Sequence, residues 1–221
     1  MSDRIHELEH SDLKWAFDDS NKPFLTIKTG GSWGSRQEYV DPFPCYSHDI
    51  KLVESMVEHC EKRINLKFKP HYFILPYEGL SRTNGYACAN EDYAEKDVKK
   101  LNPYIVLHGK RICIHPAMTR YLVAHEFGHI TEYNLHAILK KDSDEFQKEY
   151  AKIRKIEYNK NYGALNWHKN IGEIIANDIR TWILGTEQEF WQHDVPMICV
   201  LRNEKSKIAD FWKETKEKYL S

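Results

Sequence analysis

The 221-residue sequence predicts an α+β fold, with strands mainly in its first half and helices in its second half. Short apolar runs bounded by Gly and Pro dominate up to about residue 115, whereas apolar residues recur at helical spacing from residue 118 onward. A hydrophobic content of 41% supplies enough apolar surface for a packed core. We expect one domain over residues 1–221, with residues 1–100 as its N-terminal part and residues 101–221 as the remainder.

The composition argues against several classes of protein. A formal net charge of -1 is unlike that of a nucleic-acid-binding protein, which needs a basic surplus. The N-terminal residues lack the apolar segment of a secretory signal, and no apolar run approaches the length of a membrane span. Five cysteines, an odd number without a Cys-x-x-Cys pair, favour reduced thiols over disulfides. We therefore expect a cytoplasmic protein that binds neither nucleic acid nor membrane.

The first hundred residues predict short strands around one helix. Residues 1–47 are rich in turn-forming residues, with a strand expected at residues 24–28. Apolar residues at helical spacing predict a helix over residues 49–64, followed by a strand over residues 66–75. A further short strand, residues 86–89, is expected within a long loop.

Two apolar stretches on either side of Gly109-Lys110 predict a β-hairpin. Its strands would be Tyr104–His108 and residues 111–115, because Gly in the first position of a two-residue loop suits the positive φ of a type II′ turn. Pro116 would end the second strand. Helices are then expected, in chain order, at residues 118–139, 143–158, 170–184, 187–193 and 205–219.

The helix expected over residues 118–139 contains His125-Glu126-Phe127-Gly128-His129, an H-E-x-x-H motif. Two histidines at i and i+4 stand one turn apart on one helix face, so both imidazoles can ligate one zinc ion. Glu126 can reach a water molecule on that metal without ligating the metal, and can act as general base. A glycine inside a helix costs about 1 kcal/mol relative to alanine, so we expect Gly128 to serve close packing or the site geometry. The alternative is an amphipathic helix whose two histidines face solvent.

A motif helix that follows a hairpin resembles the zincin metallopeptidases, over roughly residues 100–185. The resemblance implies a small mixed sheet whose edge hairpin packs on the motif helix, followed by a helical C-terminal half. It further implies one Zn²⁺ per chain and hydrolysis of peptide bonds in a peptide or protein substrate, which would pair with an edge strand of the hairpin. The metzincin continuation is absent, because Glu132 and Leu135 stand where that subgroup has a glycine and a third histidine.

Gluzincins, a second zincin subgroup, take their third ligand from a glutamate on a later helix. Glu173 would be that ligand here, and its Glu-x-x-Ala-Asn context is similar to that of ImmA/IrrE-like metallopeptidases. Asn177, one turn after Glu173, would accept a hydrogen bond from a ligand histidine. Other gluzincins carry an aspartate at the Asn177 position, which leaves open whether Asn177 or Asp178 orients the histidine.

Glu173 also has an explanation that needs no metal. Asn170 and Glu173 have the spacing of a capping box, in which the glutamate bonds the backbone at the helix start. The other candidates for a third ligand are Asp178, His168 and His136.

The spacing does not single out a donor for transition-state charge. His115, directly before the motif helix, and His168 are the candidates among the histidines. Other possible donors, none selected by its position, are Tyr133, Tyr158, Tyr162 and Arg180.

Two other functions compete with a zinc metallopeptidase. Peptide deformylases use an H-E-x-x-H helix with an upstream cysteine ligand, and Cys88 is the candidate, although the Glu-Gly-Cys context of that family is missing. A zinc-stabilised interaction module would keep His125, His129 and Glu173 but make no use of Glu126. The intact Glu126 favours zinc-dependent peptide-bond hydrolysis.

Overall fold

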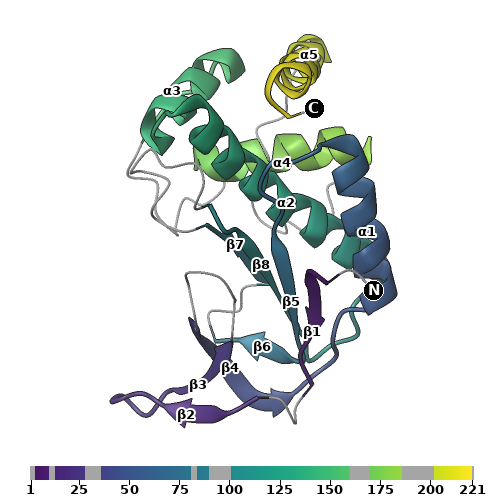
Figure 1. Ribbon diagram of the computed structural model, residues 1–221, viewed down its shortest axis with the longest axis vertical. Helices are drawn as coiled ribbons and strands as arrows, with labels where there is room; N and C mark the ends of the chain where they lie inside the picture. The colour runs from purple at the N-terminus through teal and green to yellow at the C-terminus, as the bar shows by residue number, and fades with distance from the viewer. Residues whose placement is uncertain are drawn as a thin grey trace.

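The computed structural model describes residues 3–9, 13–27, 36–80, 84–89, 101–159, 170–185 and 202–220, and the statements below concern these residues. The helices are α1 (Ile50–Arg63), α2 (Pro116–Leu139), α3 (Ser143–Arg154), α4 (Ile171–Leu184) and α5 (Arg202–Tyr219). The strands are β1 (Ile5–Glu7), β2 (Trp15–Phe17), β3 (Pro23–Ile27), β4 (Arg36–Pro44), β5 (His71–Leu75), β6 (Tyr77–Gly79), β7 (Gly85–Cys88) and β8 (Tyr104–His108). This arrangement confirms the predicted α+β class (Figure 1).

The first sheet has the strand order β1-β5-β8-β7. β1, β5 and β8 are parallel, and β7 is antiparallel to β8 at one edge. β5 and β8 are apolar along most of their length because both faces of the sheet are covered. Tyr72, Ile74, Ile105 and Leu107 face the helices, whereas Phe73, Leu75, Tyr104 and Val106 face the other way.

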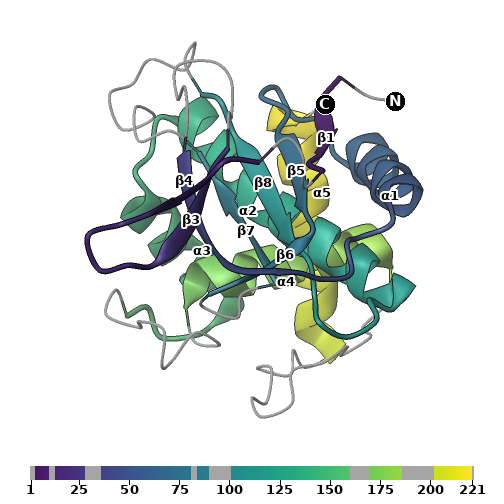
Figure 2. The ribbon, with the colours of Figure 1, turned by 90° about the horizontal axis from the view of Figure 1, so that it is seen from below.

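The second sheet has the order β2-β3-β4-β6, and its strands are antiparallel. Leu25 and Ile27 of β3 and Val40 of β4 pack with the outward face of the first sheet. The first sheet therefore lies between the helices and the second sheet, which Figure 1 shows at the lower end of the molecule. Figure 2 looks onto this second sheet from below, with β5, β7 and β8 behind it.

The predicted hairpin is wrong. β8 lies inside the sheet, between β5 and β7, and residues 111–115 form no strand. Gly109 does not have the positive φ of a type II′ turn, since Gly185 is the only described glycine with positive φ. Gly109 instead lets the chain pass close to its neighbours, because a Cβ there would lie 2.7 Å from the Tyr46 carbonyl oxygen. The antiparallel edge strand next to β8 comes from an earlier segment, β7.

Most other predicted elements have shifted ends. The strand expected at 66–75 begins only at His71, after Pro70, and the helix expected at 143–158 ends at Arg154, where Lys155 adopts the left-handed conformation. The motif helix begins at Pro116, a favoured first helical residue. The helix expected at 187–193 lies outside the described residues. In the part of the chain that is described, no helix has both the length and the apolar character needed to cross a membrane.

Candidate metal centre

The helices α2 and α4 pack against each other more extensively than any other pair of elements, and glycine permits their close approach. A Cβ on Gly128 would lie 2.7 Å from the Ala176 carbonyl oxygen and 2.8 Å from its Cα, which real Cβ atoms essentially never do. The expectation that Gly128 serves close packing is therefore confirmed. This contact brings the first turn of α4 beside the middle of α2, where the motif histidines lie.

His125 and His129 of α2 converge with Glu173 of α4. Glu173 Oε2 lies 3.2 Å from His125 Nε2 and 3.4 Å from His129 Nε2. The two imidazole rings are perpendicular, with centroids 4.9 Å apart. The three potential ligand atoms all lie within 4.8 Å of one another. The H-E-x-x-H helix and Glu173 thus meet as the sequence predicted, and the histidines do not face solvent.

The residues present fit a metal ion. Glu173 Oε2 is buried and has no hydrogen-bond partner of suitable geometry among the described residues. Two imidazole nitrogens and one carboxylate oxygen are a common protein donor set for zinc, with a fourth position left open. The competing capping box does not form, because the Asn170 side chain accepts from the Gly172 backbone N–H while the Glu173 carboxylate contacts the two histidines.

Charge within this cluster is strongly coupled. Burial opposes the charge of Glu173, but its contacts with both histidines outweigh burial and lower the pKa of the carboxyl to about 2. Burial also opposes a charged His129, yet Glu173 and the neighbouring carboxylates outweigh burial and raise its pKa to about 9. An ionised carboxylate therefore holds positive charge between the two imidazoles. A proton can supply that charge, and so can a divalent cation.

Glu126 is buried next to the cluster but does not belong to the group of ligand atoms. Burial raises the pKa of its carboxyl, and Glu173 adds to this effect. His125, His129 and, more weakly, His108 oppose the increase. A carboxyl whose pKa lies above its ordinary value holds a proton more readily than an exposed glutamate does, which suits a group that accepts and returns a proton.

Asn177 lies behind His125 and fixes its orientation. The distance from His125 Nδ1 to Asn177 Oδ1 is 3.1 Å, and Arg180 Nη1 donates to the same oxygen at 2.7 Å. Because Arg180 can only donate, it holds the amide with Oδ1 toward His125. We infer that His125 Nδ1 carries the proton, which leaves the Nε2 lone pair directed at the cluster.

The sequence did not identify a role for Tyr121, which completes this support. Its ring stacks on His125 with centroids 6.2 Å apart and an interplanar angle of 9°. The Arg180 guanidinium lies 3.8 Å from the centroid of the same ring. The i to i+4 spacing from Tyr121 to His125 was the one signal in the sequence that could have found it.

Asp178 is excluded from the cluster. Its carboxylate accepts from Arg154 Nε at 2.7 Å, from Arg154 Nη2 at 2.9 Å and from the Tyr150 hydroxyl at 2.6 Å. These bonds join α4 to α3. Asp178 is therefore neither the third ligand nor the residue that orients His125, and Asn177 has the latter position.

Several other predicted site residues lie elsewhere. His115 caps α2, where its Nδ1 accepts from the Ala117 backbone N–H, about 15 Å along the helix from His125. This distance separates His115 from the cluster of His125, His129 and Glu173. His136 lies seven residues beyond His129 and is buried, with 3.4 Å between its Nε2 and Glu132 Oε1. His168 and Tyr162 lie outside the described residues.

The remaining candidates are occupied in other ways. The Tyr158 hydroxyl donates to Asp144, and the Tyr133 ring packs against His136. Cys88 lies on β7, where its sulfur accepts from Arg36 at 3.5 Å. The group of ligand atoms found among the described residues does not include Cys88, so a deformylase-type third ligand receives no support.

A network of polar side chains links the second sheet to the first turn of α2. His108, at the end of β8, bonds Glu38 of β4 with 2.8 Å between Nε2 and Oε1. The Tyr86 hydroxyl donates to the other oxygen of Glu38 at 2.5 Å. His48 bonds the His108 carbonyl oxygen and, through Nδ1, the Thr119 hydroxyl in the first turn of α2. No short-range pattern in the sequence identifies these pairs, whose members lie 48 to 71 residues apart.

Comparison with known proteins gives no independent guide to this site. No protein-family model, curated protein or solved structure matches the chain significantly.

Proposed function

We propose that this chain is a zinc-dependent peptidase whose metal is held by His125, His129 and Glu173. The observation that carries the proposal is a buried carboxylate, Glu126, beside three ligand atoms that lie within 4.8 Å of one another. A peptide or protein is the proposed substrate.

Glu126 and Asn177 would have different roles in the hydrolysis. When bound, zinc lowers the pKa of water and polarises a carbonyl group. The Glu126 carboxylate takes a proton from the attacking water and passes it to the leaving amine, and its raised pKa brings it closer to the working pH. Asn177 holds His125 with Nε2 available for the metal.

The edge strand β7 is the proposed surface for the substrate backbone, in place of the hairpin that the sequence predicted. Among the described strands, β7 pairs with β8 alone, so its other edge can accept an extended peptide. Gly85 of β7 lies over α2, since a Cβ there would be 3.4 Å from Leu122 Cδ2. Leu122 stands one turn before Glu126. The alternative is a strand that only covers the helix.

The proposed place of action is the cytoplasm. Cys45, Cys60, Cys88 and Cys113 are free, which suits a reducing compartment.

A substrate-profiling digest of a mixed proteome tests the function directly. Glu126→Gln should lower cleavage by about 100- to 10,000-fold, the usual contribution of a general base, while keeping about one zinc per chain. Glu145→Gln, an exposed glutamate on α3, is the matched control and should cleave like the parent protein. Full activity of Glu126→Gln would refute the proposed role.

Metal analysis separates the other outcomes. Failure to bind zinc after zinc supplementation would refute the metal site itself. Zinc binding without any cleavage by the parent protein would instead favour a zinc-stabilised interaction module.

A further inference from the structure

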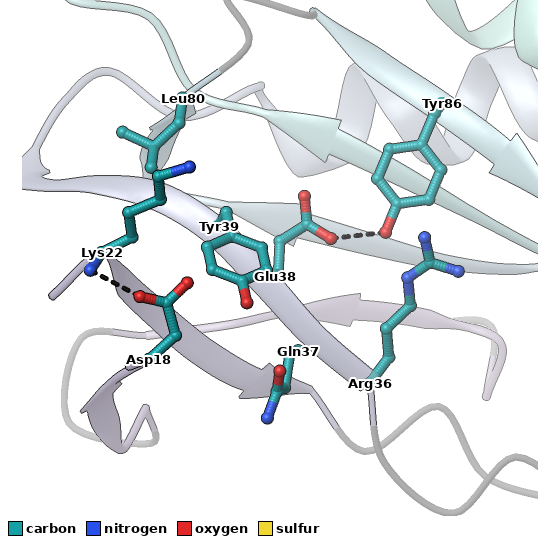
Figure 3. Close-up of a pocket in the computed structure, with 8 residues that line it drawn as sticks. All are labelled: Asp18, Lys22, Arg36, Gln37, Glu38, Tyr39, Leu80 and Tyr86. Atoms are coloured by element: carbon teal, nitrogen blue, oxygen red, sulfur yellow. Dashed lines mark hydrogen bonds between the residues drawn. The ribbon is translucent and has the colours of Figure 1, made fainter. Parts of the chain in front are cut away.

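A groove on the second sheet lies beside β7, on the face of the first sheet that is turned away from the helices. It has a volume of about 900 Å³ and is lined from the β2–β3 turn, β4, the residue after β6, and β7. The lining residues are Asp18, Lys22, Arg36, Gln37, Glu38, Tyr39, Leu80 and Tyr86 (Figure 3). A groove of this size can hold several atoms of a peptide side chain together with its backbone.

The two carboxylates of the groove already have partners. Both Glu38 oxygens are bonded, one to His108 and the other to the Tyr86 hydroxyl. Asp18 Oδ1 accepts the backbone N–H groups of Ser20 at 2.9 Å and Lys22 at 2.8 Å. These bonds occupy both oxygens of Glu38 and one oxygen of Asp18.

The two cations of the groove have donors to spare. The guanidinium of Arg36 lies over the rings of Tyr86 and Tyr104, and its Nη1 donates to the Tyr104 hydroxyl at 2.5 Å. Arg36 forms no ion pair with a carboxylate within the described ranges. Lys22, through its backbone N–H and more weakly through its charge, lowers the pKa of the Asp18 carboxyl. In Figure 3 the side chains of Arg36 and Lys22 lie at opposite ends of the groove. Arg36 thus presents N–H donors without a carboxylate partner at one end of the groove, whose two cations and two carboxylates balance in charge.

The groove is next to the proposed substrate strand. Tyr86, one of its walls, follows Gly85, which lies over α2. The Tyr86 ring lies 6.0 Å from the ring of His108. A peptide paired with the free edge of β7 would send alternate side chains toward α2 and toward this groove.

We propose that this groove binds an acidic residue of the peptide substrate, whose carboxylate or phosphate oxygens are met by Arg36. This inference rests on the proposed peptidase function. A planar guanidinium held against two aromatic rings is preorganised for two parallel bonds to a carboxylate or phosphate. The site therefore determines substrate specificity and takes no part in the proton transfers at Glu126.

The test uses three peptides that differ at one residue, with Glu, phosphoserine or Gln. The zinc-loaded protein should cleave the Glu or the phosphoserine peptide with a kcat/KM about tenfold higher than the Gln peptide, the usual effect of one charged hydrogen bond. Which acidic peptide is preferred distinguishes a carboxylate from a phosphate ligand. Arg36→Gln should abolish the preference, and Arg36→Lys should keep part of it.

The control variant is Lys62→Gln, which removes one positive charge from α1, away from the groove. It should keep the full preference for the acidic peptide. Equal kcat/KM for all three peptides, or a preference that survives Arg36→Gln, would overturn the proposed groove ligand.

A binding measurement keeps this result separate from the fate of the peptidase proposal. Fluorescence anisotropy with the same labelled peptides and the zinc-loaded Glu126→Gln variant needs no catalysis. Acid-dependent binding that Arg36→Gln abolishes would support the groove even if no cleavage occurs. Equal affinities for the acidic and Gln peptides would refute the groove ligand even if cleavage is rapid.

Discussion

The helix α4 carries two carboxylates, five residues apart, whose bonding differs: Asp178 is buried, and Glu173 is partly buried. Asp178 accepts three hydrogen bonds from Arg154 and Tyr150. These bonds engage both of its carboxylate oxygens and join α4 to α3. Glu173 contacts two imidazoles and keeps one buried oxygen without a hydrogen bond among the described residues. A buried carboxylate with hydrogen bonds to both oxygens stabilises the fold. A carboxylate that keeps an oxygen without a hydrogen bond beside two histidines is available to a metal ion.

The largest effect on stability is expected from loss of the Asp178 carboxylate. Asp178→Ala leaves the buried Arg154 guanidinium without its partner and should lower the free energy of unfolding by about 3–5 kcal/mol. Chemical denaturation measures this change. The fraction that remains folded should still bind about one zinc per chain. Loss of zinc binding with unchanged stability would reverse the roles that we assign to the two carboxylates.

Glu173→Ala should have the opposite profile. Loss of a direct ligand should weaken zinc binding by more than about 100-fold, since removal of a supporting partner alone costs ten- to hundredfold. The metal-free protein should lose less stability than it does with Asp178→Ala, because Glu173 lacks a complete set of hydrogen bonds. Competition with a chromophoric zinc chelator gives the affinity. An affinity equal to that of the parent protein would exclude Glu173 as a ligand.

The contacts between Glu173 and the two histidines also predict how the stability of the metal-free protein depends on pH. The Glu173 pKa falls from 4.5 to about 2, so its contribution is present above pH 4.5 and lost as the pH falls toward 2. The His129 pKa rises from 6.5 to about 9, so its contribution is full below pH 6.5 and lost as the pH rises toward 9. Both contributions are therefore complete between pH 4.5 and 6.5.

Denaturation of the metal-free protein at a series of pH values measures these two losses. Glu173→Gln removes the charge that shifts both groups and should flatten the profile on both sides. Zinc should weaken the loss at high pH, because the metal binds neutral imidazole. A parent profile that matches Glu173→Gln would show that the two histidines and Glu173 are not electrostatically coupled.

The sequence predicted the local features of the site better than the long-range ones. The spacing of His125 and His129 within one helix determines which face they share, and this prediction needs no tertiary information. The resemblance to zincins pointed to Glu173, but the choice between Asn177 and Asp178 depended on a partner, Arg154, that lies in another helix. Helical periodicity alone does not show which of two neighbouring residues will face α3 and which will face α2.

The sheet shows the same limit. The apolar run Tyr104–His108 was correctly predicted as a strand, yet its parallel partner β5 lies about thirty residues earlier. Local pairing across Gly109-Lys110 was the simplest expectation, and tertiary packing around Gly109 overrides it. The link between His108 and Glu38 spans 70 residues and has no signature in the sequence.

The smallest expected effect concerns the support of His125. Arg180→Met keeps much of the side-chain volume but removes the donor that holds Asn177 Oδ1 toward His125 Nδ1. Zinc affinity should fall by about tenfold, at the low end of the cost of losing a partner that supports a metal ligand. Arg180→Lys should restore part of the affinity, since a lysine can still donate to the amide oxygen. A merely structural Arg180 would instead lower stability equally in both variants and leave zinc affinity unchanged, so chelator competition beside denaturation distinguishes a positioning residue from a packing one.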